Sequence, residues 1–268
     1  MADWKDKVAL VTGGSAGLGF AIAEAFSSQG ASVMLAARDD RRLQEAVLRL
    51  RRAGHRVAGL ATDVTDSEQV QTLVTGTIEE FGRLDVLVNN VGRSTRGNVL
   101  DTNPEEFREL MELNFLSVVR CTQAAVPHLL ESKGHVVNIG SLASKSVSKF
   151  LGAYPASKFA VAAYSQQLRF ELNPQGVHVL LVCPGPIARE DAGQRYDQQA
   201  SDLPESARQP GGGVKLRGML PEAVAAKILH ACKGKRHELI LPSKARWLFA
   251  ISQLWPSLGD QIIRMLRE

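Results

Sequence analysis

Short runs of apolar, often β-branched residues alternate with longer amphipathic segments along most of this 268-residue chain. Apolar residues fill the runs almost continuously, as in the strands of a parallel sheet that helices cover on both faces. The runs span residues 8–12, 32–37, 57–61, 84–89, 134–139 and 177–183. Between them, apolar residues recur at helical spacing, for example Leu43, Val47 and Leu50 before Gly54. This alternation predicts one doubly wound α/β unit.

The composition excludes several other classes of protein. Hydrophobic residues form 44% of the chain, and no run reaches the roughly 18 apolar residues of a membrane-spanning helix. Three widely spaced cysteines exclude a disulfide scaffold. A net charge of +4 without a reading motif gives no reason to expect nucleic-acid binding, and the histidines lack metal-ligand spacing. Because the chain starts without the pattern of a secretory signal, we expect a cytoplasmic protein.

Two regions interrupt the alternation. Residues 186–220 carry charges, prolines and three consecutive glycines, a pattern that predicts a long substrate loop. Residues 244–267 are amphipathic and predict two short helices around Pro256. We expect a single domain over 1–268, with the cofactor-binding and catalytic core at 5–190, followed by this loop and a C-terminal helical tail.

A glycine-rich turn follows the first predicted strand, with Thr-Gly-Gly-Ser-Ala-Gly-Leu-Gly at 12–19. Glycines let the backbone turn tightly and let a phosphate approach the amides, and the following helix N-terminus adds positive partial charge. The spacing differs from the commoner Gly-x-Gly-x-x-Gly fingerprint. A tight turn without a ligand is the alternative, but the position between the first strand and the first helix favours nucleotide binding.

The end of the second predicted strand bears on the choice between NAD and NADP. An NAD site needs a carboxylate there for the ribose 2′-hydroxyl, but Ala37 occupies that place and Arg38 follows. A guanidinium suits a 2′-phosphate, and Ser15 could add a hydroxyl, so we expect NADP rather than NAD. Alternatively, Arg38 is only a solvated charge at a helix start that Asp39 caps. Asp63 and Val64, after the third strand, are expected beside the adenine.

Tyr154 and Lys158 open a predicted helix and share one of its faces. An ammonium beside a phenol favours the phenolate and lowers its pKa, which gives a proton donor and acceptor usable near neutral pH. Ser141 ends the preceding strand, where an open α/β sheet binds its ligands. Its hydroxyl could bond a substrate carbonyl, although a serine at a strand end is also an ordinary cap.

These motifs together resemble the short-chain dehydrogenase/reductases of the compact single-domain subtype. The turn at 12–19 matches their cofactor motif, and Asn-Asn-Val-Gly at 89–92 matches their Asn-Asn-Ala-Gly. Asn114 matches their active-site asparagine, Ser141 and Tyr154 keep their spacing, and Pro184-Gly185 matches the turn at the nicotinamide. The resemblance covers residues 5 to 190 well and extends loosely to 241. It implies a Rossmann-type doubly wound parallel sheet of about seven strands with helices on both faces.

The family's mechanism carries over residue by residue. It implies that Tyr154 is the general acid for ketone reduction and the base for alcohol oxidation. Lys158 would lower the pKa of Tyr154 and bind the ribose of the nicotinamide, Ser141 would polarise the carbonyl, and Asn114 would hold a water linking Lys158 to solvent. From the residues alone, Asn114 would be a helix-interior amide bonded to the backbone. The implied cofactor contacts are Gly13, Ser15, Gly17, Leu18, Gly19, Arg38, Asp63, Val64, Asn90, Gly92, Tyr154, Lys158, Pro184, Gly185 and Ile187.

The sequence therefore predicts an NADP(H)-dependent oxidoreductase acting on a ketone or secondary alcohol. A reductase of 3-oxoacyl thioesters on acyl-carrier protein, a reductase of long-chain lipid ketones, and a non-catalytic NADP-binding sensor are the alternatives. Helices near 103–130 and 154–172 are expected to pair subunits into a homodimer or homotetramer. Two features depart from the family: Arg189 stands where many members have threonine, and the tail is additional.

The tail has three interpretations. It could cover the substrate cleft, pack in a subunit interface or contact a membrane surface weakly, since basic residues flank Trp247 and Trp255. Packing between subunits is the commonest use of such a segment. The substrate is expected to be partly apolar, because loop and tail would bring Leu203, Val214, Leu216, Met219, Leu220 and Trp247 near the cleft.

Overall fold

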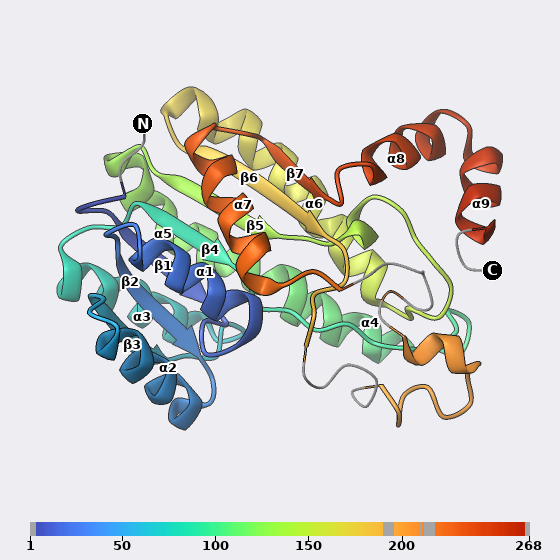
Figure 1. Cartoon of the computed structure of the whole chain (residues 1–268), viewed down its shortest axis with the longest axis horizontal. Coiled ribbons are helices and arrows are strands. Elements are labelled where there is room, and N and C mark those ends of the chain that lie inside the picture. Colours follow the sequence, from blue (N-terminus) through green and yellow to red (C-terminus); the bar gives the residue numbers. More distant parts are fainter. Residues whose placement is uncertain (1–3, 190–195, 210, 212–217, 266–268) are drawn as a thin grey trace.

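The computed structural model describes residues 4–189, 196–209, 211 and 218–265. Its centre is a parallel seven-stranded sheet in the order β3-β2-β1-β4-β5-β6-β7 (Figure 1). The strands are β1 (Val8–Thr12), β2 (Ser32–Ala37), β3 (Val57–Ala61), β4 (Val86–Asn89), β5 (His135–Ile139), β6 (His178–Pro184) and β7 (Glu238–Leu241). The predicted doubly wound sheet is confirmed, and the predicted strands differ from these by at most two residues at an end.

Helices form a layer on each face of the sheet (Figure 1). One layer holds α1 (Gly17–Ser27), α2 (Asp40–Arg52) and α7 (Pro221–Lys233), and the other holds α3 (Ser67–Phe81), α5 (Ser117–Ser132) and α6 (Tyr154–Leu172). Successive strand residues point to opposite faces, so Ala9 and Val11 pack under the first layer while Leu10 packs under the second. Burial of strand residues on both faces explains the nearly continuous apolar runs in the sequence.

Side-chain caps fix where several helices begin. The Asp39 carboxylate accepts a hydrogen bond from the main-chain nitrogen of Arg42 at 3.0 Å, and Asp66 caps α3 in the same way. Such caps satisfy amides that have no partner within the helix. At the other end of α3, Gly82 adopts the left-handed conformation, with φ of 82°. The predicted cap role of Asp39 is therefore confirmed.

The helix expected near 103–130 is not uniform. Its first part is α4 (Pro104–Met111), which continues through a π-helical segment at Glu112–Leu116 into α5. Single π-helical turns within α-helices occur frequently at functional sites. Asn114 lies in this widened turn and is fully buried. Short 3-10 turns at Leu142–Ser144, Asn173–Gln175 and Glu205–Arg208 complete the described helical elements.

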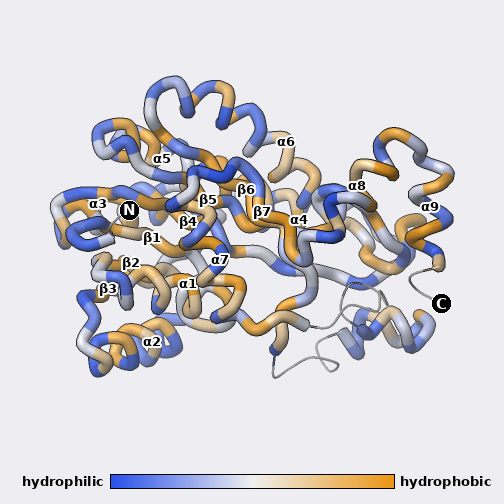
Figure 2. Tube along the Cα trace, turned by 45° about the horizontal axis from the view of Figure 1, so that its top comes forward, coloured by the Kyte–Doolittle hydropathy of each residue, from blue (hydrophilic) through white to orange (hydrophobic). Residues whose placement is uncertain are grey.

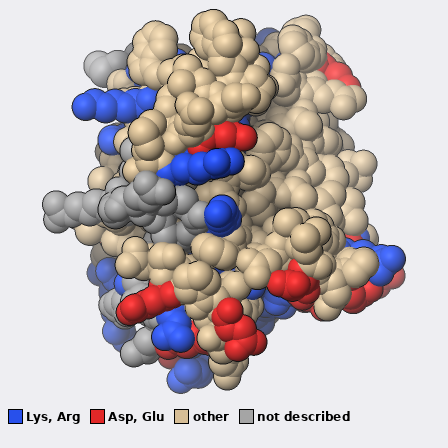
Figure 3. Space-filling model, turned by 90° about the vertical axis from the view of Figure 1, so that its right-hand side faces the viewer, with Lys and Arg blue, Asp and Glu red and all other residues tan. Residues whose placement is uncertain are grey.

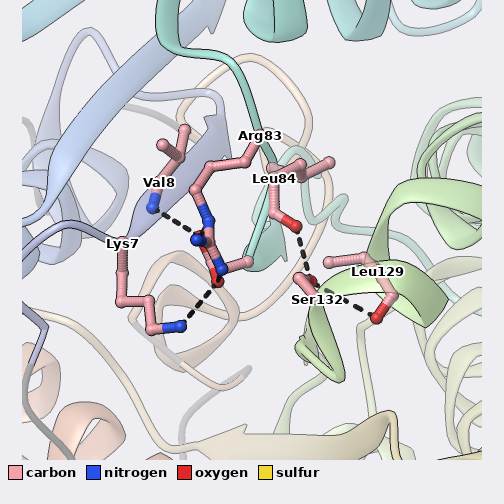
Figure 4. A network of polar contacts seen from close by, with 7 residues as sticks. Lys7, Val8, Arg83, Leu84, Leu129 and Ser132 are labelled. Atoms are coloured by element: carbon pink, nitrogen blue, oxygen red, sulfur yellow. Dashed lines mark hydrogen bonds and ion pairs between the residues drawn. The ribbon is translucent and has the colours of Figure 1, made fainter.

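A buried carboxylate ties the chain together at the amino ends of the strands. Asp85 is 3% exposed and accepts hydrogen bonds from Lys7 at 3.0 Å and from two nitrogens of Arg83 at 2.7 and 2.8 Å. It also accepts one from the main-chain nitrogen of Val8 at 3.0 Å. Figure 4 shows Lys7, Val8 and Arg83 converging on the carboxylate of Asp85. Near this carboxylate, the Ser132 hydroxyl donates to the main-chain oxygens of Leu84 and Leu129. This network joins β1 to β4 at the end of the sheet opposite the candidate site.

The tail forms two short helices, α8 (Ala245–Leu254) and α9 (Pro256–Met265), which project beyond the sheet (Figures 1 and 2). Phe249 anchors α8 because its side chain is 8% exposed and packs in a cluster with Leu181 and Ile240. The two helices cross closely at Gly259, where a Cβ would overlap Ser252. In the part of the chain that the structure describes, no helix combines the length and apolar character that crossing a bilayer requires.

Candidate active site

Two cavities open at the carboxyl ends of the strands. The larger has a volume of about 770 Å³ and the smaller about 300 Å³. Leu18, Asn90, Gly92 and Arg189 line both, so the two cavities adjoin. They lie where the strand order reverses, between β1 and β4, which is where open α/β sheets bind ligands.

The glycine-rich turn forms the floor of the smaller cavity. Gly13 and Gly17 have φ of 64° and 54°, a left-handed conformation that side chains disfavour. A Cβ on Gly19 would overlap the main-chain oxygen of Gly13 and would lie 2.6 Å from the amide nitrogen of Asn90. Asn90 in turn donates to the main-chain oxygen of Thr12 at 3.0 Å, which fixes the turn to the end of β4. The turn is therefore built for close packing, and Gly13, Gly17 and Gly19 bring its backbone to the cavity wall without side chains.

The end of β2 offers a cation and no carboxylate to this cavity. Ala37 and Arg38 line it, together with Thr62 and Val64 from beyond β3. Arg38 is exposed, and its guanidinium lies 3.9 Å from the Asp63 carboxylate. Asp63 does not line the cavity, because its carboxylate accepts hydrogen bonds from the nitrogen and hydroxyl of Thr65.

Two of the predicted cofactor contacts are thus not on the cavity wall. Asp63 is one, and Ser15 in the turn is the other. Burial alone would raise the pKa of Asp63, but the bonds from Thr65 and the charge of Arg38 lower it. Thr62 takes the place that the sequence analysis gave to Asp63, and nothing in the sequence distinguished these neighbours.

The larger cavity holds the predicted catalytic side chains. Ser141 follows β5 and Tyr154 begins α6, and a side-chain hydrogen bond connects them. The Ser141 hydroxyl also accepts from the main-chain nitrogen of Ala143 at 3.1 Å, which holds it at the start of a 3-10 turn. Burial raises the pKa of Tyr154 to about 12, although the bond with Ser141 and the charge of Arg96 act to lower it. The phenol therefore holds its proton at neutral pH.

Lys158 lies one helical turn after Tyr154 and is 4% exposed. Its ammonium donates to the main-chain oxygen of Ile139 at 2.9 Å, and burial lowers its pKa to about 8. The sequence analysis expected this ammonium to lower the pKa of Tyr154. The structure differs, because the lysine is directed to the end of β5 and burial dominates the titration of the phenol.

Asn114 lines neither cavity but lies directly behind their junction. Its side chain accepts from the Arg93 nitrogen and donates to the Arg93 oxygen and the Ser157 hydroxyl, each at 2.9 Å. A Cβ added to Gly92 would lie 3.1 Å from the Asn114 carbonyl oxygen and 3.2 Å from the Lys158 nitrogen. Asn114 therefore bonds the backbone, as its residue type alone suggested, and also approaches Lys158.

Sequence reasoning missed a cation–aromatic pair at the cavity wall. Arg96 is 5% exposed, and its guanidinium lies 3.6 Å from the centre of the Tyr196 ring. It donates to the main-chain oxygens of Ala207 at 2.7 Å and Gln209 at 3.2 Å. These bonds attach the described part of the substrate loop to the segment after β4. An isolated arginine in a loop carries no sequence signal for such a role.

The remaining walls come from the turn after β6 and from the tail. Pro184, Gly185 and Ile187 line the larger cavity, as the resemblance implied, and Arg189 reaches both cavities. From the tail, Leu248, Phe249, Ile263 and Met265 line it. The apolar residues expected there differ: Leu203, Met219, Leu220 and Trp247 are not on its wall, and Val214 and Leu216 lie outside the described residues.

Comparison with known proteins agrees with this arrangement. The model of the short chain dehydrogenase family matches residues 7–200. The chain belongs to the short chain dehydrogenase family. Among relatives of this dehydrogenase, oxidoreductase YxnA of Bacillus subtilis is 31% identical over 98% of this chain and 72% of its own length. Ketoacyl reductase HetN of Nostoc is 30% identical, over 96% of this chain and 88% of its own.

A solved structure has the same fold. A short chain dehydrogenase/reductase from Burkholderia phymatum, in complex with NAD, is 27% identical and superposes with a TM-score of 0.83. The match covers 96% of each chain. This dehydrogenase therefore has the oxidoreductase fold of its family over its length, including the doubly wound sheet that the sequence predicts.

Proposed function

We propose that this dehydrogenase transfers hydride between NADP(H) and a ketone or secondary alcohol, with Tyr154 as the general acid and base. The convergence of Ser141, Tyr154 and Lys158 on one cavity, which adjoins a glycine-lined cavity, carries this proposal. The nicotinamide supplies the hydride, and the protein positions the substrate carbon and moves the proton. No other cluster in the described chain combines a polar triad with a cavity at the switch point of the sheet.

The proton step follows from the environment of Tyr154. A phenol that is protonated at neutral pH can donate its proton to a developing alkoxide in ketone reduction, and burial raises the pKa of Tyr154 further. Ser141 bonds the same phenol and would also bond the substrate carbonyl, so that acid and substrate are held together. The Lys158 ammonium lies behind the site and donates to the main-chain oxygen of Ile139. Asn114 bonds Arg93 and Ser157, the residue before Lys158.

The choice of NADP rests on the end of β2. No carboxylate lines the smaller cavity there, while Arg38 does, and Arg38 is exposed enough to meet an incoming phosphate. A guanidinium pairs well with phosphate oxygens. The Burkholderia relative is in complex with NAD, so the proposal of NADP for this chain rests on Arg38 and not on the fold.

A reductase of 3-oxoacyl thioesters is the second candidate. The similarity to ketoacyl reductase HetN favours it. A cavity of about 770 Å³ with Leu248, Phe249 and Ile263 on its wall offers room for an acyl chain, and Lys244 on the same wall suits an anionic carrier group. A sensor without catalysis is disfavoured, because the polar groups needed for proton transfer are in place.

Assembly and location remain proposals. We expect a homodimer or homotetramer through α5 and α6, and the exposure of Phe159 and Phe170 on α6 supports this, since a covering subunit would bury them. A cytoplasmic location stays a prediction from the sequence.

The decisive test replaces Tyr154 by phenylalanine. Tyr154→Phe removes the proton donor while keeping the ring, so turnover of ketones with NADPH should fall to background while NADPH still binds in a fluorescence titration. Tyr164→Phe is the matched control: it makes the same change on the same helix, where the ring packs edge-to-face on Phe115. Turnover by Tyr154→Phe at the rate of the control would refute the assigned acid.

A further inference from the structure

The two tail helices carry an apolar surface that faces away from the protein. On α8, Trp247, Ile251 and Leu254 are spaced i, i+4, i+7, and on α9 Leu258 and Ile262 are spaced i, i+4. Residues with this spacing share one face of a helix. Four large apolar side chains here are strongly exposed: Trp247 (74%), Leu254 (68%), Trp255 (60%) and Leu258 (46%). So dense an apolar exposure on two short helices indicates a contact surface.

Positive charge accompanies this surface. Arg246 and Arg264 are exposed on the two helices, and Asp260 is the acidic residue in their described part. Neither arginine forms an ion pair with any residue that the structure describes. Figure 3 views the molecule from the side of the tail and shows a broad uncharged area in its upper half, with both basic and acidic side chains at its margin.

The apolar surface and its positive charge decide between two possible partners for this face, a second copy of the chain and an anionic lipid membrane. A second copy of the chain would bring two surfaces of the same positive charge together, which costs free energy. An anionic lipid surface complements the charge and also accepts the aromatic side chains, because tryptophan favours the boundary between headgroups and acyl chains. Each helix has ten residues, too short to cross a bilayer but suitable for lying on it. We propose that the α8–α9 face docks this dehydrogenase on anionic lipid membranes.

The opposite side of the same helices gives this docking a consequence for the substrate. Leu248 and Phe249 of α8 and Ile263 and Met265 of α9 line the larger cavity, while Trp247 and Trp255 are exposed and are not on its wall. A docked tail therefore places the cavity wall next to the lipid. The substrate class that fits is a ketone or alcohol with a long apolar body, taken from the membrane. This second step rests on the proposed function, whereas the docking itself does not.

The experiment uses the distribution of tryptophans in the full chain. Trp4 is 3% exposed, so Trp247 and Trp255 are the exposed tryptophans. Vesicles of phosphatidylcholine with phosphatidylglycerol should shift the emission to shorter wavelength and co-sediment the protein, and added salt should weaken both effects. Vesicles of phosphatidylcholine alone should bind markedly less.

Variants then locate the contact. Trp247→Ser/Trp255→Ser should weaken co-sedimentation roughly tenfold or more, because two exposed rings no longer enter the lipid. Arg246→Gln/Arg264→Gln should remove the preference for anionic vesicles. Leu100→Ser is the matched control, since Leu100 is 94% exposed but lies before α4, and it should bind like the unchanged protein.

Three outcomes would overturn the docking: no binding, equal binding of neutral and anionic vesicles, or unchanged binding of the double tryptophan variant. If that variant instead loses self-association in lipid-free solution, a second copy covers the face and the proposal is wrong. Reduction of a short water-soluble ketone should be the same in the double tryptophan variant and the unchanged protein. Absence of that activity in the unchanged protein would refute the proposed function and leave the vesicle result standing.

Discussion

Replacing Arg38 by alanine should change the cofactor preference of this dehydrogenase. The guanidinium stands at the end of β2 on the wall of the smaller cavity, where a 2′-phosphate would lie. A hydrogen bond to a charged group contributes about 1.5–3 kcal/mol. Because 68% of the Arg38 side chain is exposed, solvent and salt screen the interaction, and the lower end of that range applies. About 1.5 kcal/mol corresponds to a roughly tenfold weaker Kd for NADPH.

NADH should respond differently. It lacks the 2′-phosphate, and Asp63, which lies 3.9 Å from the guanidinium, stays bonded to Thr65 when Arg38 is removed, so the Kd for NADH should stay constant. The assay is a fluorescence titration of the purified variant with both nucleotides at low and high salt. The difference between the variant and the unchanged protein should shrink as salt rises.

Arg52→Ala is the matched control, because it removes the same charge at the far end of α2. It should leave both dissociation constants unchanged. Equal losses of NADPH and NADH affinity in Arg38→Ala would refute the phosphate contact. A loss of NADPH affinity in Arg52→Ala would likewise show that the overall positive charge, and not a contact with the 2′-phosphate, determines NADPH affinity.

Two further perturbations test the cradle and the sheet. Gly19→Ala should lower both NADPH affinity and Tm, because the new Cβ overlaps a main-chain oxygen of the turn. Gly76→Ala is the control, since its Cβ meets only an ordinary contact at 3.7 Å, and it should preserve both quantities. Similar affinities and Tm values for the two variants would contradict the steric argument. Burial lowers the pKa of His135 and His178 to about 4, below the value near 6.5 of an unfolded chain. Folding therefore favours the neutral rings, and the stabilisation present above about pH 6.5 should be lost towards pH 4, by roughly 3 kcal/mol for each ring. Urea unfolding across this range measures the change, and a constant free energy of unfolding would refute it.

The sheet and its helices were predictable because each strand is covered on both faces. This burial makes the strand sequence almost wholly apolar, as in Val8–Thr12, and leaves a glycine or an acidic cap such as Asp39 where the chain turns. The shared position of Ser141, Tyr154 and Lys158 could also be predicted from their order along the chain, since parallel strands bring their carboxyl ends to one edge of the sheet.

Features that depend on contacts between distant segments escaped prediction. The π-helical turn at Asn114 has no local pattern, because its widening accommodates the bonds to Arg93 and Ser157. The direction of the Lys158 ammonium towards Ile139 and the attachment of the substrate loop by Arg96 likewise depend on tertiary packing. Periodicity predicted the tail helices, but which of their apolar residues face the cavity depends on how Phe249 anchors α8.

The loop and the tail form two walls of the larger cavity, and they are attached to the protein in different ways. Arg96 holds the loop wall by hydrogen bonds to main-chain oxygens, and such bonds weaken steeply when their angles change. The tail wall rests on the apolar contact of Phe249, which tolerates sliding because it has no preferred direction. The loop thus sets a fixed boundary near the reacting carbon, while the tail yields to substrates of different bulk. Adaptation to a new substrate would begin with substitutions in α8 and α9 and leave the chemistry at Tyr154 untouched.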